Sequence, residues 1–119
     1  MDNKLTIIQE SIDEKIILKV SGRLDANHAS YLDDKLSGLI QEGKYIIGLD
    51  LHEVAFLSSA GIRILVKQNK AFKKISGELY IANSSENVQT VLDMVGMSSL
   101  FAPKGIEEKK AETKSVSSL

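Results

Sequence analysis

The first part of the chain shows two apolar segments separated by a polar one, and then a change of period. Residues 4–9 and 16–22 are rich in Ile, Leu and Val, and the polar stretch 10–15 lies between them. This arrangement predicts a β-hairpin. From Asp25 onward apolar side chains recur at helical spacing, and Gly43 is placed to end that helix. Its apolar positions are Ala29, Leu32, Leu36, Leu39 and Ile40.

The second part alternates strands with helices. Residues 45–51 are typical of a buried strand, and residues 78–82, introduced by Gly77, are typical of another. Between them the segment 59–75 has helical spacing, and a third helix ends at Gly96. The stripe over 59–75 consists of Ile62, Leu65, Val66, Asn69 and Phe72. The third helix carries Val88, Val91, Leu92 and Val95.

Strands that alternate with helices predict an α/β fold. We expect a mixed, mainly parallel sheet of four to five strands, with the N-terminal hairpin as its antiparallel part and helices packed against it. A chain of 119 residues, 43% of them hydrophobic, buries one core. After residues 101–103 the sequence is rich in Lys, Glu and Ser. The domain is therefore expected to span 1–108, with 109–119 as a polar, disordered tail.

Composition excludes several classes of function. The 15 basic and 16 acidic side chains give a net charge of −1, so a general attraction to nucleic acid or anionic membranes is not expected. The absence of cysteine excludes disulfides, thiolate chemistry and cysteine zinc sites. There is no apolar signal region, and no stretch approaches the roughly 18 apolar residues that span a bilayer. We expect a cytoplasmic protein without membrane insertion.

Candidate chemistry is expected where the parallel strands end, because their carboxyl ends meet at one edge of a sheet. This edge is predicted to hold Arg23, Leu24 and Asp25, then Asp50 and the loop 52–59, and finally Asn83, Ser84 and Ser85. The loop is the most informative part, because Ser58 and Ser59 stand at the start of a helix. Free backbone N–H groups and the helix dipole favour negative charge there, so a phosphate on Ser59 would be tolerated.

The same residues also have purely structural explanations. Serine is among the best N-cap residues, and spacing alone favours a capping role for Ser58 or Ser59. Asp25 is equally explained as the cap of the first helix. Gly61 is harder to explain in this way, because glycine costs about 1 kcal/mol relative to alanine inside a helix. Its presence indicates that another group approaches the backbone closely.

The stretch 48–62, which reads Gly-Leu-Asp-Leu-His-Glu-Val-Ala-Phe-Leu-Ser-Ser-Ala-Gly-Ile, resembles the signature of the bacterial anti-sigma factor antagonists and the wider STAS domain class. Residues 21–25, Ser-Gly-Arg-Leu-Asp, are similar to a second turn of that family. The resemblance covers residues 4–108. It puts the family's phosphorylated serine at Ser59, with Ser58 in place of an Asp and Ala60 in place of Ser or Thr. Ser58 is the alternative phosphoacceptor.

The resemblance implies a partner switch. The unmodified protein would bind an anti-sigma factor that is also an ATP-dependent serine kinase, and would thereby release a sigma factor. Phosphorylation would end this binding, and a metal-dependent phosphatase would reverse it. Besides Ser58, Ser59 and Ala60, the predicted partner surface contains Arg23, Asp25, Gly61, Arg63 and Lys67.

A basic stripe runs along the helix over 59–75. Its members, Arg63, Lys67, Lys70 and Lys74, follow one another at spacings of three or four residues. A solvated helix face is the simplest explanation. In the functional alternative, the stripe meets an acidic surface of the partner kinase.

Functions of other classes are less well supported. A hydrolase with Ser59 as nucleophile would want glycine at position 57, which is Leu57, and a base from His28 or His52. No cluster of side chains has the spacing of a metal site, and no cofactor is expected. A STAS subunit of a membrane transport complex or another signalling assembly is the main alternative, because fold alone does not decide function. The sequence leaves open whether the protein is a monomer or a weak dimer.

Overall fold

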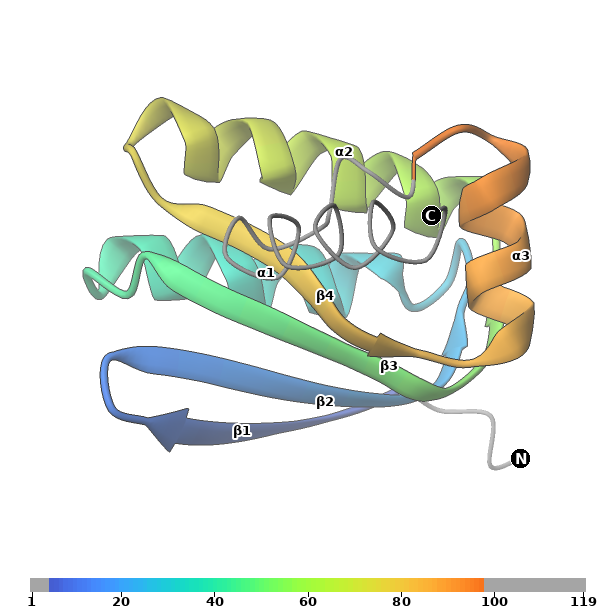
Figure 1. Ribbon diagram of the computed structural model, residues 1–119, viewed down its shortest axis with the longest axis horizontal. Coiled ribbons are helices and arrows are strands. Elements are labelled where there is room, and N and C mark those ends of the chain that lie inside the picture. The colour runs from blue at the N-terminus through green and yellow to red at the C-terminus, as the bar shows by residue number, and fades with distance from the viewer. Residues whose placement is uncertain (1–4, 98–119) are drawn as a thin grey trace, which may run out of the picture.

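The N-terminal hairpin consists of β1, Thr6–Ile12, and β2, Lys15–Leu24, which pair antiparallel (Figure 1). The computed structural model describes residues 5–97. The predicted hairpin is confirmed, but its turn is shorter than expected: only Asp13 and Glu14 separate the strands, and Asp13 has a φ of 57°. Residues 10–12 were assigned to the turn because they are mostly polar. They belong to an edge strand whose side chains are largely exposed.

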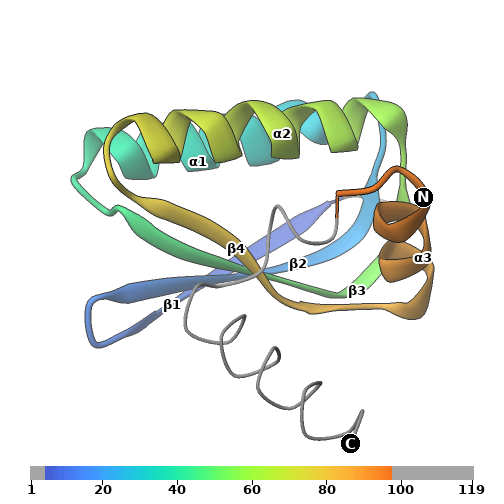
Figure 2. The ribbon, with the colours of Figure 1, turned by 45° about the horizontal axis from the view of Figure 1, so that its top comes forward.

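The remaining elements complete a four-stranded sheet in the order β1-β2-β3-β4, parallel from β2 to β4. Along the chain these elements are α1 (Ala29–Gln41), β3 (Ile46–Leu57), α2 (Ser59–Lys74), β4 (Glu78–Ser84) and α3 (Glu86–Met94). Helices α1 and α2 lie side by side on one face of the sheet (Figure 2), because both crossovers advance the strand order in the same direction with the same hand. Helix α3 packs at one end, against β3 (Figure 1). The predicted α/β fold is confirmed.

The core lies between the sheet and the pair α1 and α2. Its fully buried side chains include Leu18, Leu32, Leu36, Leu49, Leu51, Leu65 and Phe72. Two polar residues of α2 are also buried there, Gln68 and Asn69. The Asn69 Nδ2 donates to the Leu79 carbonyl at 3.1 Å, and the Gln68 Nε2 donates to the Asp33 Oδ1 at 2.6 Å. These bonds fix α2 against β4 and α1.

Strand β3 runs six residues beyond the predicted end at Leu51. Its buried side chains past that point follow at intervals of three, at Leu51, Val54 and Leu57. The interval arises because β3 carries extra residues relative to β2 at two register shifts, at Lys19/Ser21 and Gly22/Arg23. A bulged strand loses the two-residue alternation that identifies a strand in the sequence, and this is why the prediction was wrong.

Glycines end two of the helices in the left-handed conformation, as predicted. Gly43 follows α1 with a φ of 81°, and Gly96 follows α3 with a φ of 70°. No helix within residues 5–97 is long and apolar enough to cross a membrane. The predicted domain boundary at residue 108 and the polar tail 109–119 lie outside the described residues.

Candidate functional site

The carboxyl end of β2 and the start of α2 meet at the backbone of Leu24. The Leu24 carbonyl accepts from the Ser58 backbone N–H at 3.1 Å and from the Ser58 hydroxyl at 3.0 Å. Gly61 lies against the same carbonyl: a Cβ at position 61 would stand 2.6 Å from the Leu24 oxygen. The close approach predicted at Gly61 is therefore confirmed, and the approaching group is the backbone of β2.

Ser58 and Ser59 have different structural roles. Ser58 is the N-cap of α2, and its hydroxyl accepts from the Gly61 backbone N–H at 3.2 Å while it donates to Leu24. Its side chain is half-buried and uses both hydrogen-bonding functions. Ser59 is the first residue of α2 and is exposed, and its hydroxyl has no hydrogen-bond partner within residues 5–97. Capping thus explains Ser58 and leaves Ser59 unexplained.

A cluster of charged side chains lies on the turn that follows β2. Asp25 accepts from the Asn27 and His28 backbone N–H groups at 3.1 Å each and lies 2.7 Å from the His28 Nδ1. Its other oxygen is 3.5 Å from the Arg23 Nε. Asp25 therefore caps the turn before α1 rather than α1 itself, whose N-cap is His28. Desolvation works to raise the pKa of Asp25, but the hydrogen bond and charge of His28 outweigh it and lower that pKa below 3.8.

Phe56 joins this edge of the sheet and was not singled out from the sequence. It is the cross-strand partner of Arg23, whose guanidinium lies 4.3 Å from the ring centroid. The ring is 40% exposed. Exposed aromatic and arginine side chains are typical anchors of protein interfaces. Only the register between β2 and β3 reveals this pair, because the two residues are far apart in the chain.

The structure brings most of the predicted partner residues to one edge. Arg23 lies at the end of β2 and Asp25 directly follows it, and Ser58 and Ser59 begin α2 beside them. Ala60 and Gly61 complete the first turn of that helix, Ala60 half-buried and Gly61 buried. The backbone contact at Leu24 holds the two groups together.

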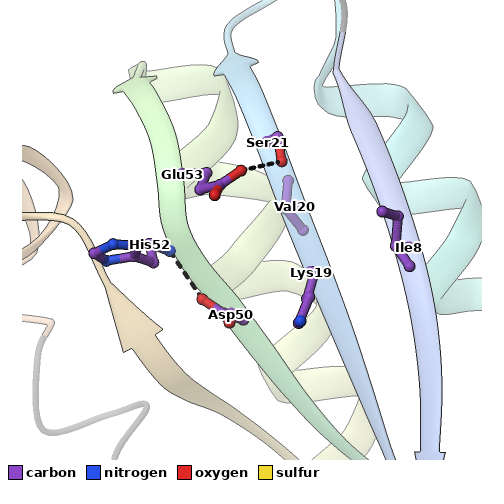
Figure 3. A pocket seen from close by; sticks show the side chains of 7 residues that line it. All are labelled: Ile8, Lys19, Val20, Ser21, Asp50, His52 and Glu53. Carbon is purple, nitrogen blue, oxygen red and sulfur yellow. Dashed lines mark hydrogen bonds between the residues drawn. The ribbon is translucent and has the colours of Figure 1, made fainter.

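Asp50 and His52 do not belong to this edge. They lie within β3, on the sheet face opposite α1 and α2, where a hollow of about 270 Å³ is also lined by Lys19 and Glu53 (Figure 3). The His52 backbone N–H donates to the Asp50 Oδ1 at 3.0 Å, and the Ser21 hydroxyl donates to the Glu53 Oε1 at 3.2 Å. The prediction placed them at the edge because it ended β3 too early.

The residues predicted to follow β4 are placed differently from one another. Asn83 and Ser84 are the last residues of β4 and pair with Asp50 and Leu51, so they too lie away from Ser59 along β3. Ser85 is the N-cap of α3 and accepts from the Val88 backbone N–H at 3.3 Å. These residues therefore have structural roles or lie beside the hollow of β3.

The basic stripe extends away from this edge along α2. Arg63, Lys67 and Lys70 are exposed, and the Lys67 Nζ lies 2.9 Å from the Asp33 Oδ2 on α1. Desolvation works to raise the pKa of Asp33, but hydrogen bonds from Lys67 and Gln68 outweigh it and lower that pKa below 3.8. Within the described residues, Arg63 and Lys70 have no ion-pair partner.

The histidines give no support to a hydrolase. The His28 Nδ1 faces Asp25, and His52 lies on β3 beside Asp50. Across residues 5–97, neither imidazole hydrogen-bonds to Ser59. The same residues contain no group of three or more His, Cys, Asp or Glu side chains placed to hold a metal ion.

Comparisons with known proteins relate the chain to a family. The STAS domain model matches residues 5–113. BtrV of Bordetella bronchiseptica is 28% identical over 108 residues, which are 91% of each chain. The anti-sigma-B factor antagonist of Staphylococcus epidermidis is 30% identical over 89 residues, covering 75% of this chain and 82% of that protein.

A solved structure has the same fold. The anti-sigma factor antagonist SpoIIAA in its unphosphorylated form gives a TM-score of 0.71 at 17% identity, covering 89% of this chain and 97% of that one. The phosphorylated form of SpoIIAA from Bacillus gives a TM-score of 0.65. At these identities the likeness concerns the fold, whereas the family match and the Staphylococcus relative concern the sequence. The chain belongs to the STAS domain family, and its curated relatives place it among the anti-sigma factor antagonists.

Proposed function

We propose that this chain is a cytoplasmic anti-sigma factor antagonist whose binding to its partner is controlled by phosphorylation of Ser59. The observation that carries the proposal is the difference between the two serines at the start of α2. Ser58 is held by Leu24 and Gly61, while the Ser59 hydroxyl is exposed and has no partner within the described residues. A kinase can therefore reach Ser59 without disrupting the helix cap. The names of the curated relatives favour this role over that of a transport-complex subunit.

The proposed switch is electrostatic. A phosphoserine carries about −1.5 to −2 charges at neutral pH. At the first position of α2 this charge faces free backbone N–H groups, so the isolated domain tolerates it. An interface formed around a neutral hydroxyl does not, because the phosphate must be desolvated there. Each 1.4 kcal/mol of this penalty lowers affinity about tenfold, so a few kcal/mol reverse binding without any refolding.

The proposed partners follow from the switch. The unphosphorylated chain binds an anti-sigma factor that is also an ATP-dependent serine kinase, and a metal-dependent phosphatase restores the unphosphorylated state. Arg23, Asp25 and Phe56 flank Ser59 at the docking edge and provide an aromatic and charged rim. The protein itself acts by binding and has no catalytic role.

The test is phosphorylation by a candidate anti-sigma factor kinase with ATP, followed by peptide mass spectrometry to locate the phosphate. Binding of the kinase is then measured with the phosphorylated and the unphosphorylated chain. We expect one phosphate, on Ser59, and at least about a hundredfold loss of affinity, which corresponds to about 2.8 kcal/mol.

Two variants serve as controls. Ser59→Ala should accept no phosphate and should keep its affinity in the presence of ATP. Ser58→Ala loses a helix cap but should still be phosphorylated at Ser59. A phosphate found on Ser58, or binding that is the same before and after modification, would contradict the proposal.

A further inference from the structure

A groove with an apolar floor runs along α2 from Ser59. Its volume is about 450 Å³, and its floor consists of Ile62, Val66 and Met97. The chain after α3 returns toward α2 (Figures 1 and 2), so that Met97 faces the same groove as the two α2 residues. Ile62 and Met97 pack against the core, and Val66 is partly buried. The apolar floor is thus a fixed part of the folded domain.

The sides of the groove are basic. Arg63, Lys67 and Lys70 line it, and no acidic residue does among the residues that the structure describes. Lys67 is partly neutralised by Asp33 at 2.9 Å. Arg63 and Lys70 are exposed and have no carboxylate at ion-pair distance within residues 5–97. The uncompensated charge therefore lies at two positions seven residues apart, or about 10 Å along the helix.

We propose that this groove binds an amphipathic helix of the anti-sigma factor kinase. Aliphatic side chains of that helix contact Ile62, Val66 and Met97, and two acidic side chains about two turns apart pair with Arg63 and Lys70. The charge complementarity is the reason for an acidic partner, and the length of about 16 Å from Ser59 to Lys70 suits three turns of helix. The apolar contacts provide affinity, and the cations orient the partner and speed its association.

The inference rests on the proposed function and adds to it the chemistry of the partner. Ser59 lies at one end of the groove, one helical turn before Arg63. Side chains on a helix lean toward its N-terminus, so Arg63 extends toward Ser59. A phosphate on Ser59 would then pair with Arg63 and compete with an acidic side chain of the partner helix. Phosphorylation would release the helix by occupying one of its two anchors.

The test uses the full-length, unphosphorylated chain and the candidate kinase. The variant Arg63→Glu/Lys70→Glu reverses the two uncompensated charges. Its matched control is Lys44→Glu/Lys73→Glu, which makes the same change of charge at two exposed lysines that belong neither to the groove nor to the basic stripe. Thermal unfolding followed by circular dichroism establishes that both variants are folded. We expect association of the groove variant to be about tenfold slower at low salt and that of the control to change less than about twofold.

A second measurement locates the contact. The chain has three methionines, so ¹³C-methyl labelling gives few, resolved signals. On addition of the kinase, the Met97 methyl signal should shift, while that of Met94, which is 79% exposed on α3 and outside the groove, should not.

The outcomes separate the two proposals. Failure of the unmodified chain to bind the kinase would contradict the proposed function and this inference together. If the unmodified chain binds the kinase but both charge variants weaken binding equally, the groove proposal alone is wrong. The same holds if binding leaves the Met97 methyl signal unchanged. A Met97 shift that grows with protein concentration in the absence of kinase would also overturn it, because a second copy of this chain would then fill the groove.

Discussion

Two helical glycines, Gly38 in α1 and Gly61 in α2, differ in what surrounds them. A Cβ added at Gly38 would meet nothing within 4 Å. A Cβ added at Gly61 would lie 2.6 Å from the Leu24 carbonyl oxygen and 2.9 Å from the Leu57 Cδ1. Since the nearest atom belongs to the backbone, it cannot rotate away. Relief requires the end of β2 or the start of α2 to move.

The structure predicts that alanine has opposite effects at these two positions. Alanine is favoured over glycine in a helix by about 1 kcal/mol, and at Gly38 nothing opposes this gain. At Gly61 the same gain is set against an overpacking cost of about 1–3 kcal/mol. The free energy of unfolding should therefore rise by about 1 kcal/mol in Gly38→Ala, and should stay level or fall by up to about 2 kcal/mol in Gly61→Ala.

Urea unfolding of both variants, followed by far-ultraviolet circular dichroism, measures the difference. The two free energies of unfolding should be separated by about 1–3 kcal/mol, with similar slopes in urea. Equal stabilisation of both variants would refute the reasoning. It would mean that α2 and β2 separate at no cost, and that Gly61 is not required for the contact that positions Ser59.

Three further predictions concern single groups. Ser58→Ala should lower the free energy of unfolding by about 1 kcal/mol, whereas Ser59→Ala should change it by less than about 0.5 kcal/mol. Urea titrations that show equal losses of this free energy in the two variants would contradict the assigned roles. The pKa of Asp25 is lowered in the folded state, so its stabilising contribution is present above pH 3.8 and is lost as the pH falls below that value. In Asp25→Asn the free energy of unfolding should therefore fall less steeply as the pH is lowered. An unchanged dependence on pH would contradict a stabilising role of the Asp25 carboxylate. Burial and, to a smaller extent, the charge of Glu78 raise the pKa of Tyr80. Glu78→Gln should therefore lower this pKa toward 10.0 without fully restoring that value, as followed by NMR of the tyrosine ¹³Cζ. A titration that does not move would exclude the contribution of Glu78.

The helices and their ends were readable from the sequence because their signals are local. The predicted helix over 59–75 corresponds to α2, Ser59–Lys74, and Gly43 and Gly96 follow α1 and α3 as expected. Apolar spacing reports the buried side of a helix, and a glycine at the helix end adopts the left-handed conformation that other residues avoid. Both signals depend only on neighbours within a few residues.

The site was predicted in part. The motif and its spacing indicated Ser58, Ser59 and Gly61, and the family resemblance put the phosphoacceptor at Ser59, but spacing left open which of the two serines caps the helix. That choice depends on the Leu24 carbonyl, which lies 34 residues before Ser58 in the chain. This carbonyl accepts a hydrogen bond from the Ser58 hydroxyl. Asp50 was wrongly placed at the same edge, because bulges in the pairing with β2 let β3 continue to Leu57.

The sequence by itself determined the order of strands and helices, the one apolar core and the serine pair at the start of α2. Only the tertiary structure decided which serine is accessible, that Phe56 lies under Arg23, and that Lys67 pairs with Asp33 while Arg63 has no ion-pair partner among residues 5–97. The physical reason is the range of the interactions. Helix periodicity and capping act within one or two turns, whereas strand register and contacts between helices join residues that are 30 or more positions apart, and no local pattern records them.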